Sequence, residues 1–167
     1  MNRFFYTLHL DIISGYLINE YGECYGEKIL LKGYREVLKK GDNVLSVHIP
    51  SGEPFDKERC LSSFERAKHI FKTYYPEYEY KCFTCYSWLM EKRLKEIIGK
   101  ETNITRFADL FHAFPTCSDG KAHYSIFKMG KDVPYSDYPE NTSIQKAVKK
   151  HLLDGGYFYF KGGIIVD

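Results

Sequence analysis

The chain has 167 residues, of which 44% are hydrophobic and 17% aromatic, and this composition is typical of a packed globular protein rather than a disordered chain. Its 24 basic and 22 acidic residues leave a formal net charge of +2, which argues against a general electrostatic attraction to nucleic acid or to an anionic membrane. Five cysteines, an odd number at irregular spacing, argue against a disulfide framework and indicate reduced thiols in the cytoplasm.

The N-terminal 40 residues are predicted to form strands. Phe4–Asp11 alternates between apolar and polar residues, and Lys28–Lys32 follows as a second short strand. Charged residues such as Arg3 and Asp11 interrupt the apolar start, and no small-residue cleavage site follows it. We therefore expect neither a signal peptide nor a membrane anchor.

The stretch LSVHIPSGEP at residues 45–54 predicts a strand, a tight loop and the start of a helix. Its first half alternates, so the apolar side chains share one face of the strand and His48 lies on the opposite face. Prolines and a glycine then form a turn, and Asp56 is a suitable helix cap. A strand that ends at a helix N-terminus is where many α/β folds bind phosphate.

A long helix is predicted from Asp56 to the proline at position 76, because apolar residues recur there at helical spacing. The aromatic run YKCFTCYSWL from Tyr80 is typical of a strand. A short helix over Glu91–Ile98 follows, closed by Gly99, and Asn103 is expected to cap a further helix.

The last third is predicted to contain two hairpins that flank a helix. The Asp-Gly turn in SDGK joins the runs FHAFPTC and AHYSIFKM as a first hairpin, and YFYF-KGG-IIV forms a second one at the end. Between them Thr142 or Asn141 caps a helix that ends at Gly155. The order of elements predicts an α+β (mixed α/β) fold, with a central mixed β-sheet flanked by helices.

Three short signatures in this chain resemble those of the GNAT-like C-terminal domain found in bacterial acyltransferase-domain proteins. They are GDNVLSVHIPSG (Gly41–Gly52), CYSWLM (Cys85–Met90) and TNITRF (Thr102–Phe107), with a weaker similarity in NTSIQKAVKKHLLDGG. The resemblance covers residues 41–167, while residues 1–40 contribute the N-terminal strands, so we expect one GNAT-like unit over 1–167.

The resemblance implies a GNAT-type fold that binds acetyl-CoA or another acyl-CoA as acyl donor. The strand Val44–Ile49 and the helix after it would form the pyrophosphate site, with Ile49, Ser51 and Gly52 at the donor. The pantetheine would lie between that strand and the strand Tyr80–Ser87. Family members carry a separate N-terminal domain, so a companion domain or a homodimer is an expected partner.

The loop at residues 48–54 departs from the glycine-rich loop that GNAT enzymes use to hold pyrophosphate. Pro50 and Pro54 lack backbone N–H donors, and only Gly52 is conformationally permissive. Glu53 and Asp56 place negative charge where the helix dipole favours an anion. The junction therefore matches an acyl-CoA site in position but not in its chemistry.

Three residues are candidates for the chemistry of acyl transfer to a small-molecule or peptide amine. His48 would act as the general base, or its imidazole would instead tie down the loop. Tyr86 or Ser87 would protonate the departing thiolate. Because neighbouring strand residues point to opposite faces, only one of these two can face the cleft. The alternative is that Tyr86 belongs to the core and Ser87 caps the next helix.

Two further patterns are weaker. Cys82 and Cys85 form C-x-x-C, but residues three apart in a strand point to opposite faces, so we expect buried thiols and no metal site. The lysines near the end, such as Lys146, lie on the polar face of a helix, and we expect no nucleic-acid partner. The leading hypothesis is a GNAT-like N-acyltransferase. The alternative is a non-catalytic module that docks a partner domain or protein.

Overall fold

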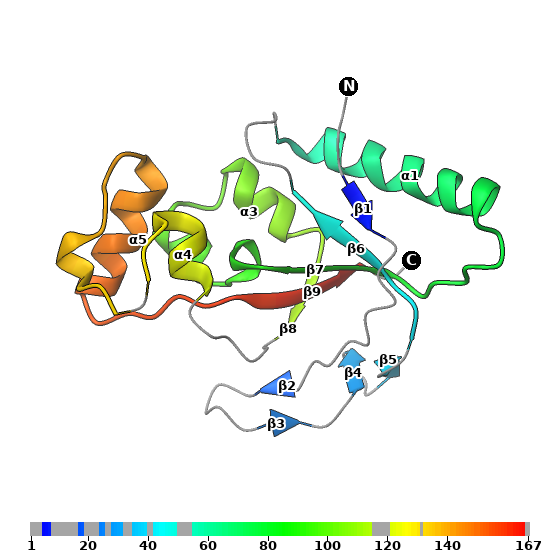
Figure 1. The fold of residues 1–167 in the computed structure, drawn as a ribbon, viewed down its shortest axis with the longest axis horizontal. Helices are drawn as coiled ribbons and strands as arrows, with labels where there is room; N and C mark the ends of the chain where they lie inside the picture. Colours follow the sequence, from blue (N-terminus) through cyan, green and yellow to red (C-terminus); the bar gives the residue numbers. More distant parts are fainter. Residues whose placement is uncertain are drawn as a thin grey trace.

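A five-stranded mixed sheet in the order β1-β6-β7-β9-β8 organises the molecule (Figure 1). The computed structural model describes residues 5–7, 17–18, 24–25, 28–31, 35–39, 42–49, 55–114, 121–130 and 132–165. The strands of this sheet are β1 (Phe5–Thr7), β6 (Leu45–His48), β7 (Phe83–Ser87), β8 (His112–Phe114) and β9 (Lys161–Ile165). Only β6 and β7 run parallel, and the other neighbours are antiparallel. The predicted α+β class with a central mixed sheet is confirmed.

Two small antiparallel pairs lie apart from this sheet. They are β2 (Leu17–Ile18) with β3 (Cys24–Tyr25), and β4 (Lys28–Leu31) with β5 (Arg35–Lys39). Residues 5–7 of the predicted strand Phe4–Asp11 form β1, and residues 28–31 of the predicted strand Lys28–Lys32 form β4; the other residues of both predictions lie outside the described part of the chain.

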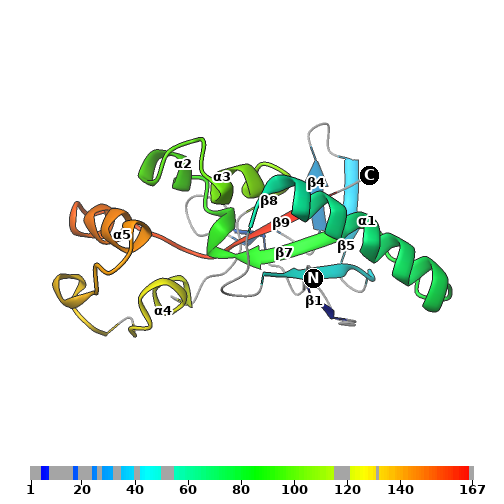
Figure 2. The ribbon, with the colours of Figure 1, turned by 90° about the horizontal axis from the view of Figure 1, so that it is seen from above.

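Helices cover one face of the sheet and extend beyond one end of it. Figure 2 shows α1, α2 and α3 on the same side of the sheet, with α4 and α5 beyond the strand ends. The helices are α1 (Lys57–Tyr74), the 3₁₀ turn η1 (Trp88–Met90), α2 (Leu94–Ile97), α3 (Asn103–Ala108), α4 (Lys121–Phe127), the 3₁₀ turn η2 (Tyr135–Asp137) and α5 (Ser143–Leu153). Among the described residues, no helix combines the length and apolarity that a membrane span needs.

Helix α1 follows the prediction closely because its signals are local. A side-chain oxygen of Asp56 accepts a hydrogen bond from the Arg59 backbone N–H at 2.9 Å, which satisfies one of the free donors of the first turn. The buried residues recur every three or four positions, and Phe64 and Phe71 are among them. Phe64 packs its ring 5.1 Å from that of Phe83, so α1 is held against the start of β7.

The buried side chains form two clusters. The first lies between α1, α3 and the sheet and contains, among others, Leu45, Phe83 and Phe107. The second joins α2, α4 and α5 around Tyr138 and Phe158. The partly buried side chains of Trp88 and Ile104 pack against both clusters and so connect them.

Helix α5 begins as the sequence predicts. The Thr142 hydroxyl accepts a hydrogen bond from the Gln145 backbone N–H at 3.2 Å, and the Gln145 side chain accepts one from the Thr142 backbone N–H at 3.2 Å. This reciprocal pair is a capping box, which orients the first turn of the helix. After the helix, Gly155 adopts a positive φ of 85°, a conformation that favours glycine.

Both predicted hairpins are wrong. The run AHYSIFKM, expected as a strand, instead lies largely in α4, because Ala122 and Ile126 are one helical turn apart and both are buried in the second cluster. The run YFYF at residues 157–160 forms no strand, and β9 pairs with β7 and β8 rather than with a neighbouring hairpin arm. In both cases packing between distant segments outweighs local strand propensity.

The cap of α3 is also corrected. Thr102, not Asn103, is the N-cap, because its hydroxyl accepts a hydrogen bond from the Thr105 backbone N–H at 3.2 Å. Asn103 is instead the first residue of the helix and is exposed. This one-residue shift leaves the Asn103 side chain available to line a pocket.

Candidate functional site

The two parallel strands at the centre of the sheet part after a short paired segment. Backbone pairing of β6 with β7 joins Leu45 to Phe83 and Ser46 to Thr84. Beyond these residues β6 continues in register with β1 as far as His48, while β7 continues in register with β9 as far as Ser87. Each strand therefore follows its outer neighbour, and the diverging ends of β6 and β7 are visible in Figure 1.

His48 and Tyr86 occupy matching positions on either side of this gap. Each lies two residues beyond the last paired position, formed by Ser46 and Thr84, so continued pairing would have placed them opposite each other. Residues two apart along a strand share a face, and His48 and Tyr86 therefore belong to one face of the sheet. Both side chains are exposed. The tertiary structure places these two candidates on one face of the sheet, where the pairing of β6 with β7 ends.

The His48 imidazole has a polar neighbour on its own strand. Its Nε2 atom lies 3.3 Å from the hydroxyl oxygen of Ser46, which shares its face of β6. This contact restrains the ring on the open side of the strand, at the edge of the gap.

The Tyr86 ring is supported by an aromatic side chain from the segment before β9. The ring centroids of Tyr86 and Phe160 are 5.0 Å apart, with an angle of 34° between the ring planes. Tyr86 remains 46% exposed although β7 has a neighbouring strand on each side. The phenol is therefore accessible at the centre of the sheet.

Ser87 lies on the other face of β7, toward the helices. It alternates with Tyr86 and shares its face with the buried Cys85. The Ser87 hydroxyl oxygen accepts a hydrogen bond from the Leu89 backbone N–H at 3.2 Å and caps η1. Ser87 and His48 therefore belong to opposite faces of the sheet.

The three residues expected at the acyl donor are described only in part. Ile49 directly follows β6 and is half-buried, with its side chain packed against the first cluster. Ser51 and Gly52 lie outside the described residues.

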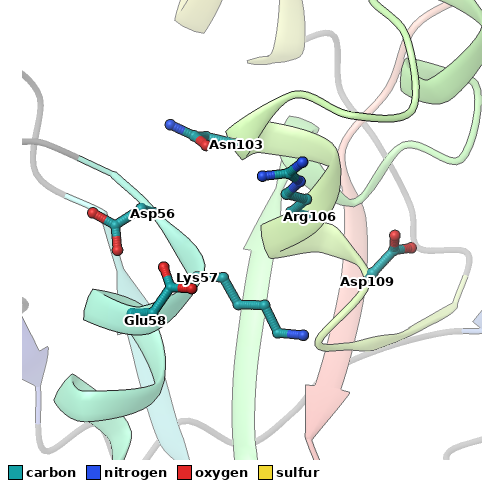
Figure 3. Close-up of a pocket in the computed structure, with 6 residues that line it drawn as sticks. All are labelled: Asp56, Lys57, Glu58, Asn103, Arg106 and Asp109. Atoms are coloured by element: carbon teal, nitrogen blue, oxygen red, sulfur yellow. The ribbon is translucent and has the colours of Figure 1, made fainter.

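A pocket of about 280 Å³ opens between the N-terminus of α1 and helix α3 (Figure 3). Its lining residues come from these two helices and are Asp56, Lys57, Glu58, Asn103, Arg106 and Asp109. Figure 3 shows the Lys57 side chain extending into the space between the two helices, and the Arg106 guanidinium on the α3 side directed away from it, toward Asn103. The pocket therefore lies at the helix N-terminus that follows β6.

Neighbouring residues offset part of the charge around this pocket. Asp56 pairs with Arg59 at 3.1 Å, and Asp109 pairs with Lys95. Arg106 pairs with Glu101 at 2.8 Å. Within the described part of the chain Lys57 has no ion-pair partner, so its ammonium group is available to an anionic ligand.

The sequence contains a signal for this pocket. Asn103 and Arg106 belong to the TNITRF signature and are three residues apart, which places them on one face of a helix. Lys57 directly follows the predicted cap Asp56. The distance between α1 and α3, however, depends on packing between segments more than 40 residues apart.

Burial governs the chemistry of the described cysteines. Cys82 and Cys85 are both buried, and Cys82 directly precedes β7. Burial raises the pKa of Cys85 to about 12, and burial together with the nearby Asp56 raises the pKa of Cys60 to about 11. Among the described residues, no three histidine, cysteine or acidic side chains form a group suited to a metal ion.

These pKa shifts predict that the protein loses stability at alkaline pH. The ordinary thiol pKa is 9.0, so between pH 9 and 11 the unfolded state binds fewer protons than the folded state, and stability falls as pH rises. We expect each of Cys60 and Cys85 to contribute a loss of about 1 kcal/mol by pH 10. Urea denaturation at pH 8 and pH 10 measures this loss. A Cys60→Ala, Cys85→Ala double variant should lose less stability than the wild type over the same interval.

The chain shares its sequence pattern with one family. A family described as "GNAT-like C-terminal domain" matches residues 17–165. No curated protein matches the chain.

Solved structures of acyltransferases share the fold. One, in complex with decanoyl-CoA, superposes with a TM-score of 0.66 at 25% identity, over 83% of this chain and 42% of that chain. Another, in complex with CoA and 10C-Teicoplanin, has a TM-score of 0.66 at 21% identity, over 75% of this chain and 41% of that chain, and supports the fold alone. The chain spans less than half the length of these acyltransferases.

Proposed function

Because the chain belongs to the family of GNAT-like C-terminal domains, we propose that it transfers an acyl group from an acyl-CoA to an amine. The observation that carries this proposal is the parting of β6 and β7, with His48 and Tyr86 at matching positions on either side of the gap. In a GNAT-type fold the pantetheine arm of the donor lies between two such strands. The decanoyl-CoA complex of the similar acyltransferase supports an acyl-CoA as the donor.

The pocket between α1 and α3 suits the pyrophosphate end of the donor. It lies at the N-terminus of an 18-residue helix, where free backbone N–H groups and the helix dipole favour an anion. Lys57 adds a positive charge within the pocket, whereas Arg106 on α3 is paired with Glu101. Asp56 opposes an anion less than the sequence suggests, because it caps the helix and pairs with Arg59.

The proposed reaction is a direct attack of the amine nitrogen on the thioester carbonyl carbon. His48 accepts the proton that the nitrogen loses as the amide bond forms. The carbon–sulfur bond breaks, and the thiolate of CoA takes a proton from the Tyr86 hydroxyl. Holding the two substrates together in the gap supplies much of the acceleration, and no covalent enzyme intermediate is needed.

Tyr86 is the preferred proton donor over Ser87. Tyr86 shares a face of the sheet with His48, whereas Ser87 lies on the opposite face and caps η1. If the pantetheine arm of the donor passes between β6 and β7, its sulfur lies between the two faces of the sheet. Ser87 on the opposite face therefore stays the second candidate for the proton donor. The acceptor is proposed to be a small-molecule or peptide amine.

Calorimetric titration with acyl-CoA tests this function. The purified protein is titrated with acetyl-CoA, octanoyl-CoA and decanoyl-CoA, with CoA as reference. Saturable heat with a preference for one acyl chain supports the proposal and identifies the donor. A folded protein that gives no heat with any of them contradicts it.

Lys57→Ala is expected to weaken acyl-CoA binding about 10-fold, because one charge-assisted contact to a phosphate is lost. The matched control is Lys72→Ala, which removes the same charge from the last turn of the same helix. Titration of both variants at low and at moderate salt measures the effect. Equal affinities for the two variants would mean that the phosphates bind elsewhere.

A second candidate function is a docking module for a companion domain or a second copy of the chain. The observation that favours it is the coverage of the similar acyltransferases, which are more than twice as long as the matched region. Light scattering that shows a dimer, together with the absence of acyl-CoA binding, would favour this function over the enzyme.

A further inference from the structure

On the face of the sheet that carries His48, exposure differs between the described residues of its central strands. Near the paired ends of β6 and β7, Ile164 of the neighbouring strand β9 is fully buried on this face. Two residues further along β7, Tyr86 is 46% exposed, and His48 is exposed across the gap. The opening therefore coincides with the place where β6 and β7 part.

Three aromatic rings line the β7 side of this opening, and we refer to them as the aromatic floor: Tyr86, Phe114 and Phe160. Tyr86 and Phe160 stack at 5.0 Å. Gly162 pairs with Tyr86 on one side and with Phe114 on the other, so the three share a face. A Cβ atom added to Gly162 would clash with the Phe114 ring, which shows that this ring lies over the glycine beside Tyr86 in the sheet.

The shape of this floor favours a flat ring over a flexible chain. An alkyl chain gains most binding free energy inside an enclosed pocket, because the hydrophobic contribution is proportional to the apolar area removed from water. The Tyr86 ring is instead a flat, half-exposed surface, and aromatic pairs prefer offset or edge-to-face contacts between ring faces and edges. A planar group therefore matches the surface better than the acyl chain of the donor.

We propose that the acceptor is an amine that carries an aromatic ring, and that this ring stacks on the aromatic floor. The inference rests on the proposed function, because it places the acceptor on the His48 face while the donor enters from the side of α1 and α3. With the ring on Tyr86 and Phe160, the amine nitrogen is directed toward the gap and toward the imidazole.

Two amines of matched size test the proposal. Binding of 2-phenylethylamine and of 2-cyclohexylethylamine to the full chain is measured by saturation-transfer NMR, without any acyl-CoA. We expect the aromatic amine to bind about 3- to 10-fold more tightly, because the two differ in the ring that stacks. Equal or undetectable binding of the two amines overturns the proposal.

Variants separate the stacking contact from the proton transfer. Tyr86→Leu should remove the preference for the aromatic amine, while Tyr86→Phe should keep it, because only the hydroxyl is lost. The matched control is Tyr124→Leu in α4, which removes a 61% exposed tyrosine outside the floor. A second floor variant, Phe160→Leu, should also reduce the preference. A preference that persists in both floor variants overturns the proposal.

The outcomes for the two proposals are distinguishable. If acyl-CoA binds but the two amines bind equally, the acyltransferase function stands and the aromatic acceptor is wrong. If the aromatic amine binds selectively but no acyl-CoA binds, the floor is an aromatic site and the transferase function is wrong.

Discussion

His48→Ala is expected to lower the rate constant kcat of acyl transfer by about 10²- to 10⁴-fold, the usual contribution of a general base. The imidazole is exposed at the edge of the gap, so its removal should leave the sheet intact. The dissociation constant of acyl-CoA should change little, because the proposed phosphate contacts come from α1 and α3. Steady-state kinetics with 2-phenylethylamine as acceptor and calorimetric titration of the donor measure the two quantities.

His112→Ala is the matched control for this experiment. His112 is also exposed and lies on the same face of the sheet, but it belongs to the edge strand β8. We expect this variant to keep kcat within about two-fold, since surface substitutions away from a site have small effects. A His48→Ala enzyme with normal kcat would assign the base to another group.

Phe83→Ala is expected to reduce the free energy of unfolding by about 3 to 5 kcal/mol, a large part of the stability of a protein of this size. Phe83 is 2% exposed, lies opposite Leu45 in the paired segment of β6 and β7, and packs against the rings of Phe64 and Tyr80. Truncation of Phe83 would leave a cavity between α1 and the sheet, next to the paired segment of β6 and β7. Urea denaturation monitored by circular dichroism measures the loss.

Tyr74→Ala provides the comparison, because it removes an aromatic ring that is 71% exposed in the last turn of α1. We expect a change of no more than about 0.5 kcal/mol. Similar losses for the two variants would mean that the contacts of Phe83 do not hold α1 on the sheet.

Elements with strong local signals could be predicted from the sequence. The cap at Asp56 and the apolar spacing along α1 lie within one segment, and so do Thr142, Gln145 and the apolar face of α5. The alternation around residues 45–48 likewise placed His48 on the face opposite the core. These features need only the helical or strand period and one capping hydrogen bond, both of which the sequence carries directly.

Strand propensity predicted the wrong secondary structure where contacts with distant segments determine the conformation. Aromatic residues around His123 favour a strand, yet this residue is buried in α4 among the side chains of the second cluster. The C-terminal segment, predicted as a hairpin, contains the single strand β9, because β7 and β8 both pair with it. Hydrogen bonds to partners more than 40 residues away leave no periodic trace in the segment itself.

The candidate site divides in the same way. The sequence alone determined which residues can carry the chemistry, because His48, Tyr86 and Ser87 stand at strand ends and have suitable side chains. Only the tertiary structure decided that His48 and Tyr86 share one face across a gap while Ser87 lies on the other, and that Lys57 and Arg106 line one pocket. The reason is that strand register and helix packing join segments that are far apart in the chain. The relative positions of these segments follow from the burial of the two hydrophobic clusters and not from any single stretch of residues.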